Sequence, residues 1–197
     1  MMAATPRIER SSLMTLEAYA RERLQFRARV MAHKKNRTVQ LGEHLTLVFE
    51  DEFTIRYQVQ EMLRAERIFE AEGIQEELEA YNPLIPDGRN LKATLMLAYP
   101  EPEERRKWLE RLIGIEDKLW IQVAGFERVW AIADEDLERE NEQKTSSVHF
   151  LRFEFAENTV QALKNGAGLT IGVEHLRYAA RLETPSAVRD ALVKDFV

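Results

Sequence analysis

Hydrophobic residues in the first half of the chain recur with the spacing of α-helices. One such segment covers residues 13 to about 34, and its apolar side consists of Leu13, Leu16, Tyr19, Leu24, Val30 and Met31. A second begins near Asp51 and is expected to continue to Gly73, because glycine often follows the last turn of a helix. The segment IQEELEAY predicts a further short helix. TVQL and HLTLVFE, between the first two helices, predict strands.

Apolar and polar residues alternate in several segments of the second half, as in β-strands. The strongest strand is LKATLMLAY, and further strands are predicted at VHFLRFEFA, LTIGV and HLRYAARLE. LWIQV and FERVWAIA predict a hairpin around residues 124–125. Helices are expected over residues 102–113 and 157–165, and a C-terminal helix is expected with Thr184 as N-cap and Pro185 in its first turn. DEDLERENEQKTSS is expected to be a solvated connection with a helical turn.

The order of these elements predicts an α+β fold. We expect a helical N-terminal part packed against a largely antiparallel β-sheet, with additional short helices. The chain is treated as a single domain over residues 1–197. An alternative subdivision separates a mainly helical part, residues 1–90, from a sheet-rich part, residues 91–197.

Charged side chains interrupt the apolar sides of the first two helices. Glu66 falls near the centre of the stripe that Ile55, Val59, Met62 and Phe69 form. Arg64 lies on the opposite side of the same helix, among Phe53, Tyr57 and Ile68, and Arg23 and Arg27 lie within the stripe of the first helix. Because an isolated buried charge is too costly to persist, we expect Arg23 or Arg27 to bind Glu66 bidentately.

Two alternatives to this buried pair remain open. The arginine stems could cross the apolar stripe and place their guanidinium groups in water. The second alternative is a site for an anion, lined by Arg23, Arg27 and Arg37, in which Glu66 holds the arginines or acts as an acid or base.

Other candidate site residues lie in a loop and on two strands. The loop NPLIPDGRN is rigid and turned, and its Asp87, Arg89 and Asn90 could face a ligand. His149 is expected to be a hydrogen-bonded core residue. His175 and Tyr178, at the end of a strand, could contribute to a cleft or pack at an exposed tip. The histidines lack the spacing of a metal site, and neither a metal nor a cofactor is expected.

The composition narrows the class of protein. Of 197 residues, 45% are hydrophobic and 31% are charged, as in globular proteins. The chain has no cysteine, which excludes disulfides and cysteine-bound clusters, and its net charge of −6 makes nucleic acid an unlikely partner despite the basic segment HKKNR. No apolar run approaches the length of a membrane span, and the first residues lack the apolar stretch of a secretory signal, so a cytoplasmic location is expected.

Four segments resemble a known bacterial family. LGEHLTLVFE, YQVQEMLRAERI, YNPLIPDGRNLKATLML and KTSSVHFLRFEF, which lie between residues 41 and 155, are similar to the family called domain of unknown function 3501. The resemblance implies no assigned activity and no catalytic residues. It implies an oxidative-stress or redox setting, because members are encoded beside rubrerythrin-like and iron–sulfur oxidoreductase proteins.

Three hypotheses for the function follow. The leading one is a non-catalytic accessory or ligand-binding protein, with an unknown protein partner. The second is a small enzyme that acts on an anionic substrate through the Arg/Glu site. The third is a self-associating structural protein, because the two apolar sides of the second helix could form a homodimer interface.

Overall fold

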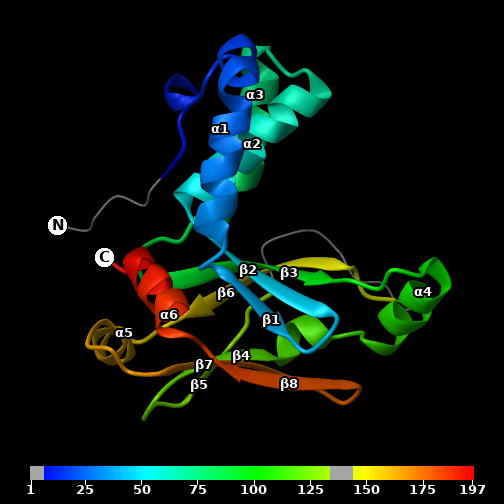
Figure 1. Cartoon of the computed structure of the whole chain (residues 1–197), viewed down its shortest axis with the longest axis vertical. Helices are drawn as coiled ribbons and strands as arrows, with labels where there is room; N and C mark the ends of the chain where they lie inside the picture. The colour runs from blue at the N-terminus through cyan, green and yellow to red at the C-terminus, as the bar shows by residue number, and fades with distance from the viewer. Residues whose placement is uncertain (1–6, 134–143) are drawn as a thin grey trace.

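The computed structural model describes residues 7–133 and 144–197. These residues form six α-helices and two four-stranded antiparallel sheets, which confirms the predicted α+β class. Three helices stand side by side as a bundle on one face of the first sheet, and the second sheet lies beneath the first (Figure 1). The segment 134–147, predicted to be a connection with a helical turn, lies mostly outside the described residues.

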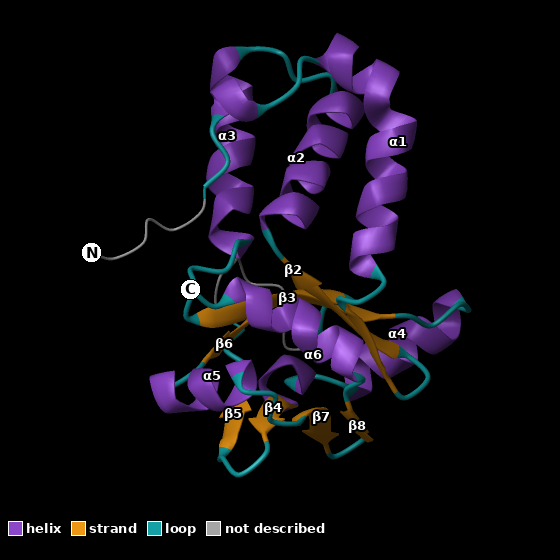
Figure 2. Ribbon diagram, turned by 60° about the vertical axis from the view of Figure 1, so that its left-hand side comes forward, coloured by secondary structure: helices purple, strands orange, loops and turns teal. Residues whose placement is uncertain are grey.

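The bundle consists of α1 (Leu16–Lys34), α2 (Glu52–Glu66) and α3 (Ala71–Tyr81), with α2 in contact with both others (Figure 2). The Thr15 hydroxyl accepts a hydrogen bond from the Ala18 N–H and caps α1. Asp51 and Thr54 form a capping box at the start of α2. The predicted continuation of α2 to Gly73 is wrong: Arg67 adopts a left-handed conformation (φ 58°), and Gly73 lies inside α3.

The first sheet has the strand order β1-β2-β3-β6, and the second has the order β5-β4-β7-β8. The bounds of the strands are β1 Thr38–Leu41, β2 Leu45–Glu50, β3 Asn90–Leu97, β4 Leu119–Val123, β5 Arg128–Trp130, β6 Val148–Glu154, β7 Leu169–His175 and β8 Tyr178–Glu183. β1 and β2, which precede α2 in the sequence, join the sheet of β3. The helical bundle is therefore formed by segments that precede and follow these two strands in the sequence.

The main core lies between the two sheets. Alternate residues of β3, Leu91, Ala93, Leu95 and Leu97, point into it, and residues of β4 and β7 face them from the second sheet. Three shorter helices complete the sandwich: α4 (Pro102–Arg111), α5 (Glu157–Lys164) and α6 (Ser186–Leu192). Pro185 is the N-cap of α6, so this helix begins one residue later than predicted, and the Thr184 hydroxyl instead donates to the Leu169 carbonyl.

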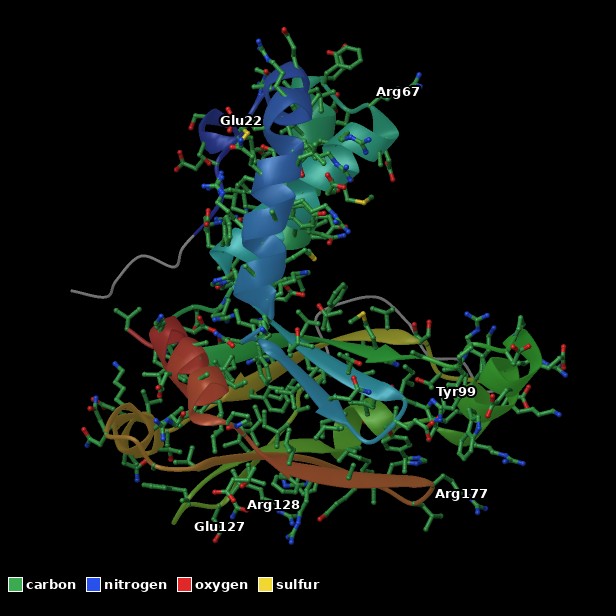
Figure 3. All side chains as sticks on the ribbon, viewed as in Figure 1. Glu22, Arg67, Tyr99, Glu127, Arg128 and Arg177 are labelled. Atoms are coloured by element: carbon green, nitrogen blue, oxygen red, sulfur yellow. The ribbon has the colours of Figure 1, made fainter. Side chains whose placement is uncertain are left out.

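The outer face of the second sheet carries aromatic and charged residues. Trp120 packs over the backbone of Gly172, where an added Cβ would lie 2.3 Å from the indole ring. The Arg128 guanidinium lies 4.0 Å from the centre of the Trp120 ring and donates to Glu174. Figure 3 shows Arg128 on this lower side of the molecule, whereas Tyr99 lies at the α4 end of the sandwich. Both positions are remote from the side of the first sheet that the bundle covers.

Candidate functional site

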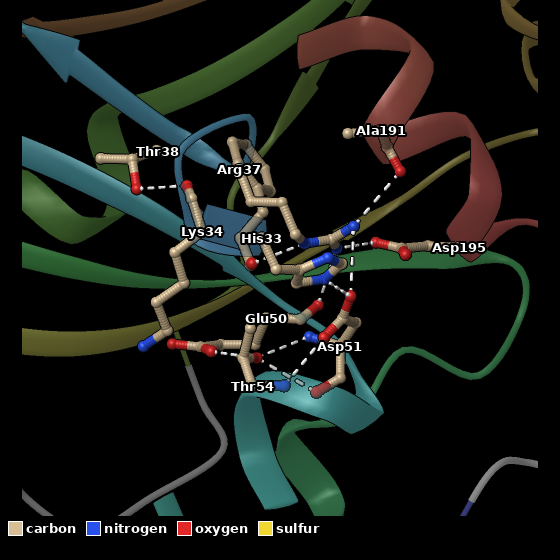
Figure 4. Close-up of polar contacts among 10 residues, drawn as sticks. His33, Lys34, Arg37, Thr38, Glu50, Asp51, Thr54, Ala191 and Asp195 are labelled. Carbon is tan, nitrogen blue, oxygen red and sulfur yellow. Dashed lines mark hydrogen bonds and ion pairs between the residues drawn. The ribbon is translucent and has the colours of Figure 1, made fainter. Parts of the chain in front are cut away.

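The chain passes between the bundle and the sandwich three times, and the three crossings lie near the C-terminus. Residues 35–37 join α1 to β1, Asp51 joins β2 to α2, and residues 85–89 join a short 3-10 helix (Asn82–Leu84) to β3. In the third crossing Gly88 adopts φ 94°, and its carbonyl accepts a hydrogen bond from the Val197 N–H. We call the side chains of His33, Arg37, Asp51 and Asp195 at this point the hinge cluster (Figure 4).

Arg37 is the centre of the hinge cluster and is 1% exposed. Its Nε donates to the Phe49 carbonyl, and its two terminal nitrogens donate to the carbonyls of Glu50 and Ala191. The same terminal nitrogens form ion pairs with the carboxylates of Asp195 and Asp51. Four hydrogen bonds and the ion pair with Asp51, at 3.5 Å, thus hold the guanidinium, so Arg37 connects both halves of the molecule.

The carboxylates of the hinge cluster differ in their surroundings. Burial raises the pKa of Asp195 to about 6, although the Arg37 guanidinium lowers it. Asp51 is less buried, and its Oδ2 lies 2.5 Å from His33 Nε2. One side chain from α1 and one from the cap of α2 therefore meet beside the buried arginine.

The expected burial of Glu66 is wrong, and so is its expected pairing with Arg23 or Arg27. Glu66 is exposed at the last residue of α2, and Arg27 and Arg64 are exposed as well. Arg23 does bind a carboxylate of α2 bidentately, but the carboxylate is that of Glu61, with both N···O distances at 2.7 Å. The Arg23 hydrogen bonds hold the pKa of Glu61 below its usual value.

The pairing with Glu66 was predicted wrongly because α1 was expected to contact the wrong face of α2. The stripe of Ile55, Val59 and Leu63 packs against α3 and the N-terminal segment, in a cluster that includes Leu78 and Ile8. α1 packs on the other side of α2, where Phe26 meets Phe53 and Tyr57. Glu61 belongs to that second side. The sequence shows that α2 has two apolar sides but does not show which side α1 contacts.

The largest described cavity, of about 470 Å³, lies where the bundle meets the first sheet. We call it the charged crevice, and its lining residues are Arg7, Asn82, Pro83, Ile85, Asp87, Asn90, Lys92, Arg152 and Glu154. Lys92 is only 7% exposed and Asn90 only 2%. Both side chains are placed by β3, whose register pairs Lys92 with Arg152 and Asn90 with Glu154 on β6.

Hydrogen bonds fix the polar groups of the crevice. Glu154 Oε1 accepts from Asn90 at 2.9 Å and from Arg152 at 2.6 Å. Burial alone would raise the pKa of Glu154, but these hydrogen bonds and the charges of Arg152 and Lys92 hold the pKa below its usual value. Glu154 is therefore ionised at neutral pH. Three cationic side chains and two carboxylates line the crevice, which leaves an excess of positive charge.

The structure places the three candidates of the 82–90 loop differently. Asp87 and Asn90 line the charged crevice, where the Asn90 side chain accepts from the Asp87 N–H. Arg89 is exposed and does not line it. Lys92, Arg152 and Glu154 were not among the sequence candidates. They occupy polar positions of β3 and β6, in which polar and apolar residues alternate. Such a pattern usually indicates a solvated sheet face, but here the bundle covers this face.

A second cavity, of about 250 Å³, lies on the same face of the first sheet as the crevice. We call it the apolar cavity, and its lining residues are Lys34, Val48, Glu50, Ile55, Gln58, Tyr81, Leu84, Thr94, Met96, Val148 and Phe150. The Glu50 carboxylate in its wall accepts hydrogen bonds from Thr94 at 2.7 Å and Thr54 at 2.5 Å. Its acceptors are therefore engaged by neighbouring hydroxyl groups.

His149 lies apart from both cavities. It is 4% exposed, and its Nε2 lies 2.9 Å from the Thr145 hydroxyl oxygen and 3.0 Å from the Ser146 carbonyl oxygen. Its Nδ1 is 3.8 Å from the Glu116 carboxylate, which is itself buried. The histidine thus belongs to a closed polar cluster.

His175 and Tyr178 lie at the turn between β7 and β8. The Tyr178 hydroxyl donates to the Leu41 carbonyl at 2.6 Å and accepts from the His44 N–H. His175 Nε2 lies 3.2 Å from the Ile113 carbonyl oxygen. Tyr178 therefore links the edge of the second sheet to the edge of the first.

Residues 7–133 and 144–197 contain neither a cluster of metal-ligating side chains nor a membrane-spanning helix. Within these ranges, no three His, Asp or Glu side chains gather in a way that could hold a metal ion. None of the helices described there combines the length and the hydrophobicity needed to span a lipid bilayer.

A family profile identifies the family of this chain, and a similar structure has been solved. A profile of the family described as protein of unknown function (DUF3501) matches residues 7–196. A crystal structure of a novel protein of unknown function from Burkholderia pseudomallei K96243 is similar, with a TM-score of 0.93 and 52% sequence identity over 98% of this chain and 100% of that one. A search of curated proteins finds no match. The resemblance seen in the sequence is confirmed, and the chain belongs to the DUF3501 family.

Proposed function

We propose that the protein is a ligand-binding protein that holds a small anionic molecule in the charged crevice. The observation that carries the proposal is the crevice itself, which is large enough for a small ligand and places the buried Lys92 and the half-buried Arg152 on one wall. A guanidinium and an ammonium group on adjacent strands suit a carboxylate or phosphate.

The geometry of the crevice favours binding over catalysis. Glu154, a carboxylate of the crevice, accepts hydrogen bonds from Asn90 and Arg152 and has a lowered pKa. It is suited to orient Arg152 and poorly suited to take up a proton at neutral pH. The crevice therefore supports the recognition of charge.

The two alternative functions have less support. The enzyme hypothesis depended on an Arg/Glu site, but neither Arg23 nor Glu61 lines any of the four described cavities. The homodimer hypothesis depended on two apolar sides of α2, and both sides are packed within the chain. The oxidative-stress setting, the accessory role beside a protein partner and the cytoplasmic location stay predictions.

Calorimetric titration with acetate, citrate and inorganic phosphate at constant ionic strength tests the proposal. We expect at least one of these anions to bind, and we expect Lys92→Gln to weaken its binding about tenfold, which corresponds to about 1.4 kcal/mol. Lys107→Gln, on the exposed side of α4, is the matched control and should bind as the wild type does. Equal binding by wild type and Lys92→Gln, or no binding of any of the three anions, would contradict the proposal.

A further inference from the structure

We propose that the ligand of the charged crevice is an amphiphile with an anionic head and an unbranched apolar chain. The head would lie beside Lys92 and Arg152, and the chain would extend into the apolar cavity. This inference rests on the proposed function and adds the chemical class of the ligand. It follows from the order in which polar and apolar residues line one continuous face of the first sheet.

Successive rows of this sheet face change from charged to apolar. Lys92 pairs with Arg152 on one side and with Glu50 on the other. One step along β3, Thr94 pairs with Phe150, and one step further Met96 pairs with Val148. Because directly paired residues point to the same side of a sheet, these rows form one surface.

The two cavities are consecutive parts of this surface. Lys92 and Arg152 line the charged crevice, whereas their row neighbour Glu50 lines the apolar cavity. Consecutive residues also line the opposite wall, since Ile85 borders the crevice and the preceding Leu84 borders the apolar cavity. Neighbouring rows lie about 7 Å apart, so a single extended molecule could contact both cavities.

The size and chemistry of each part fit different parts of a ligand. The crevice, of about 470 Å³, has polar walls and an excess of positive charge, which suits a carboxylate or phosphate head. The apolar cavity, of about 250 Å³, offers the side chains of Met96, Val148 and Phe150, which suit methylene groups. Met96 is 36% exposed, and a bound chain would cover it.

Titration with saturated carboxylates of increasing length tests this inference. Acetate, hexanoate and decanoate would be compared below their micelle concentrations, with 1-decanol as the neutral probe. We expect the affinity to rise about three- to fourfold for each methylene group that enters the cavity. We also expect 1-decanol to bind much more weakly than decanoate. A flat dependence on chain length, or equal binding of the alcohol, would overturn the inference.

Two substitutions locate the chain and the head. Met96→Gln should weaken the binding of decanoate and leave that of acetate unchanged, whereas Lys92→Gln should weaken both. Met31→Gln is the matched control, because Met31 is 40% exposed on α1 and lines none of the described cavities. If short anions bind through Lys92 without any gain from the chain, the proposed function stands and the amphiphile is excluded. If no anion of any length binds, both proposals fail.

Discussion

Arg37 is the residue on which the connection between the bundle and the sandwich depends most. Its guanidinium binds backbone carbonyls of β2 and α6 and carboxylates from two further places in the chain. Removal of one member of a buried ion pair lowers the stability of the fold, because the remaining charge stays buried without a partner. The residue was a sequence candidate for anion binding, and in the structure its guanidinium binds groups of the protein itself.

Substitution of Arg37 by methionine should therefore destabilise the protein strongly. We expect Arg37→Met to lower the free energy of unfolding by about 3–5 kcal/mol, because Asp195 and three carbonyls lose a buried partner. Urea unfolding at pH 7.5 measures the change. Arg27→Met, at an exposed position of α1, should stay within about 0.5 kcal/mol of the wild type. A loss of less than about 1 kcal/mol for Arg37→Met would refute the role of the hinge cluster.

The raised pKa of Asp195 predicts a specific dependence on pH. The folded protein holds the Asp195 proton with a pKa of about 6, whereas the usual value is 3.8, so protonation favours the folded state. The unfolding free energy of the wild type, measured relative to Asp195→Asn, should fall by about 2–3 kcal/mol as the pH rises from about 4 to about 6. Ionisable groups that the wild type and Asp195→Asn have in common contribute equally to both stabilities, so their contributions cancel in the difference. A relative stability that is constant or increases over this range would contradict the prediction.

At the scale of elements, local signals in the sequence predict most helices and strands. Alternation identified β3 within two residues of its observed bounds. The end of α2 was missed because Arg67 takes a left-handed conformation that is uncommon for residues other than glycine. The second wrong prediction concerned which residue of α2 contacts α1. Periodicity gives the faces of α2, but tertiary packing decides that Glu61, and not Glu66, meets α1.

The pairing of α1 with α2 can be tested by two glutamate substitutions on the same helix. Glu61→Ala should cost about 1–2 kcal/mol, because Arg23 and the Tyr19 hydroxyl both lose their hydrogen-bond acceptor. Glu66→Ala should change the stability by less than about 0.5 kcal/mol, since this side chain is exposed. Thermal or urea unfolding of the two variants gives the comparison. The reverse order of the two costs would restore the original hypothesis and refute the observed pairing.

At the scale of the whole molecule, a helical bundle stands on a sandwich and covers a partly charged sheet face. Lys92 and Arg152 occupy alternating positions that would be solvated on an isolated sheet. The sequence cannot reveal this site because the covering bundle is formed by two separate segments, one before β1 and one after β2. The site exists only because the three chain crossings place the bundle over this face of the sheet.

The most direct test is a crystal structure of the wild-type protein with decanoate at a saturating concentration. The proposal predicts the carboxylate within hydrogen-bonding distance of Lys92 or Arg152 and the chain beside Met96, Val148 and Phe150. Decanoate bound elsewhere, or bound in the reverse direction with its chain in the charged crevice, would contradict it. So would a crevice that remains free of decanoate at that concentration.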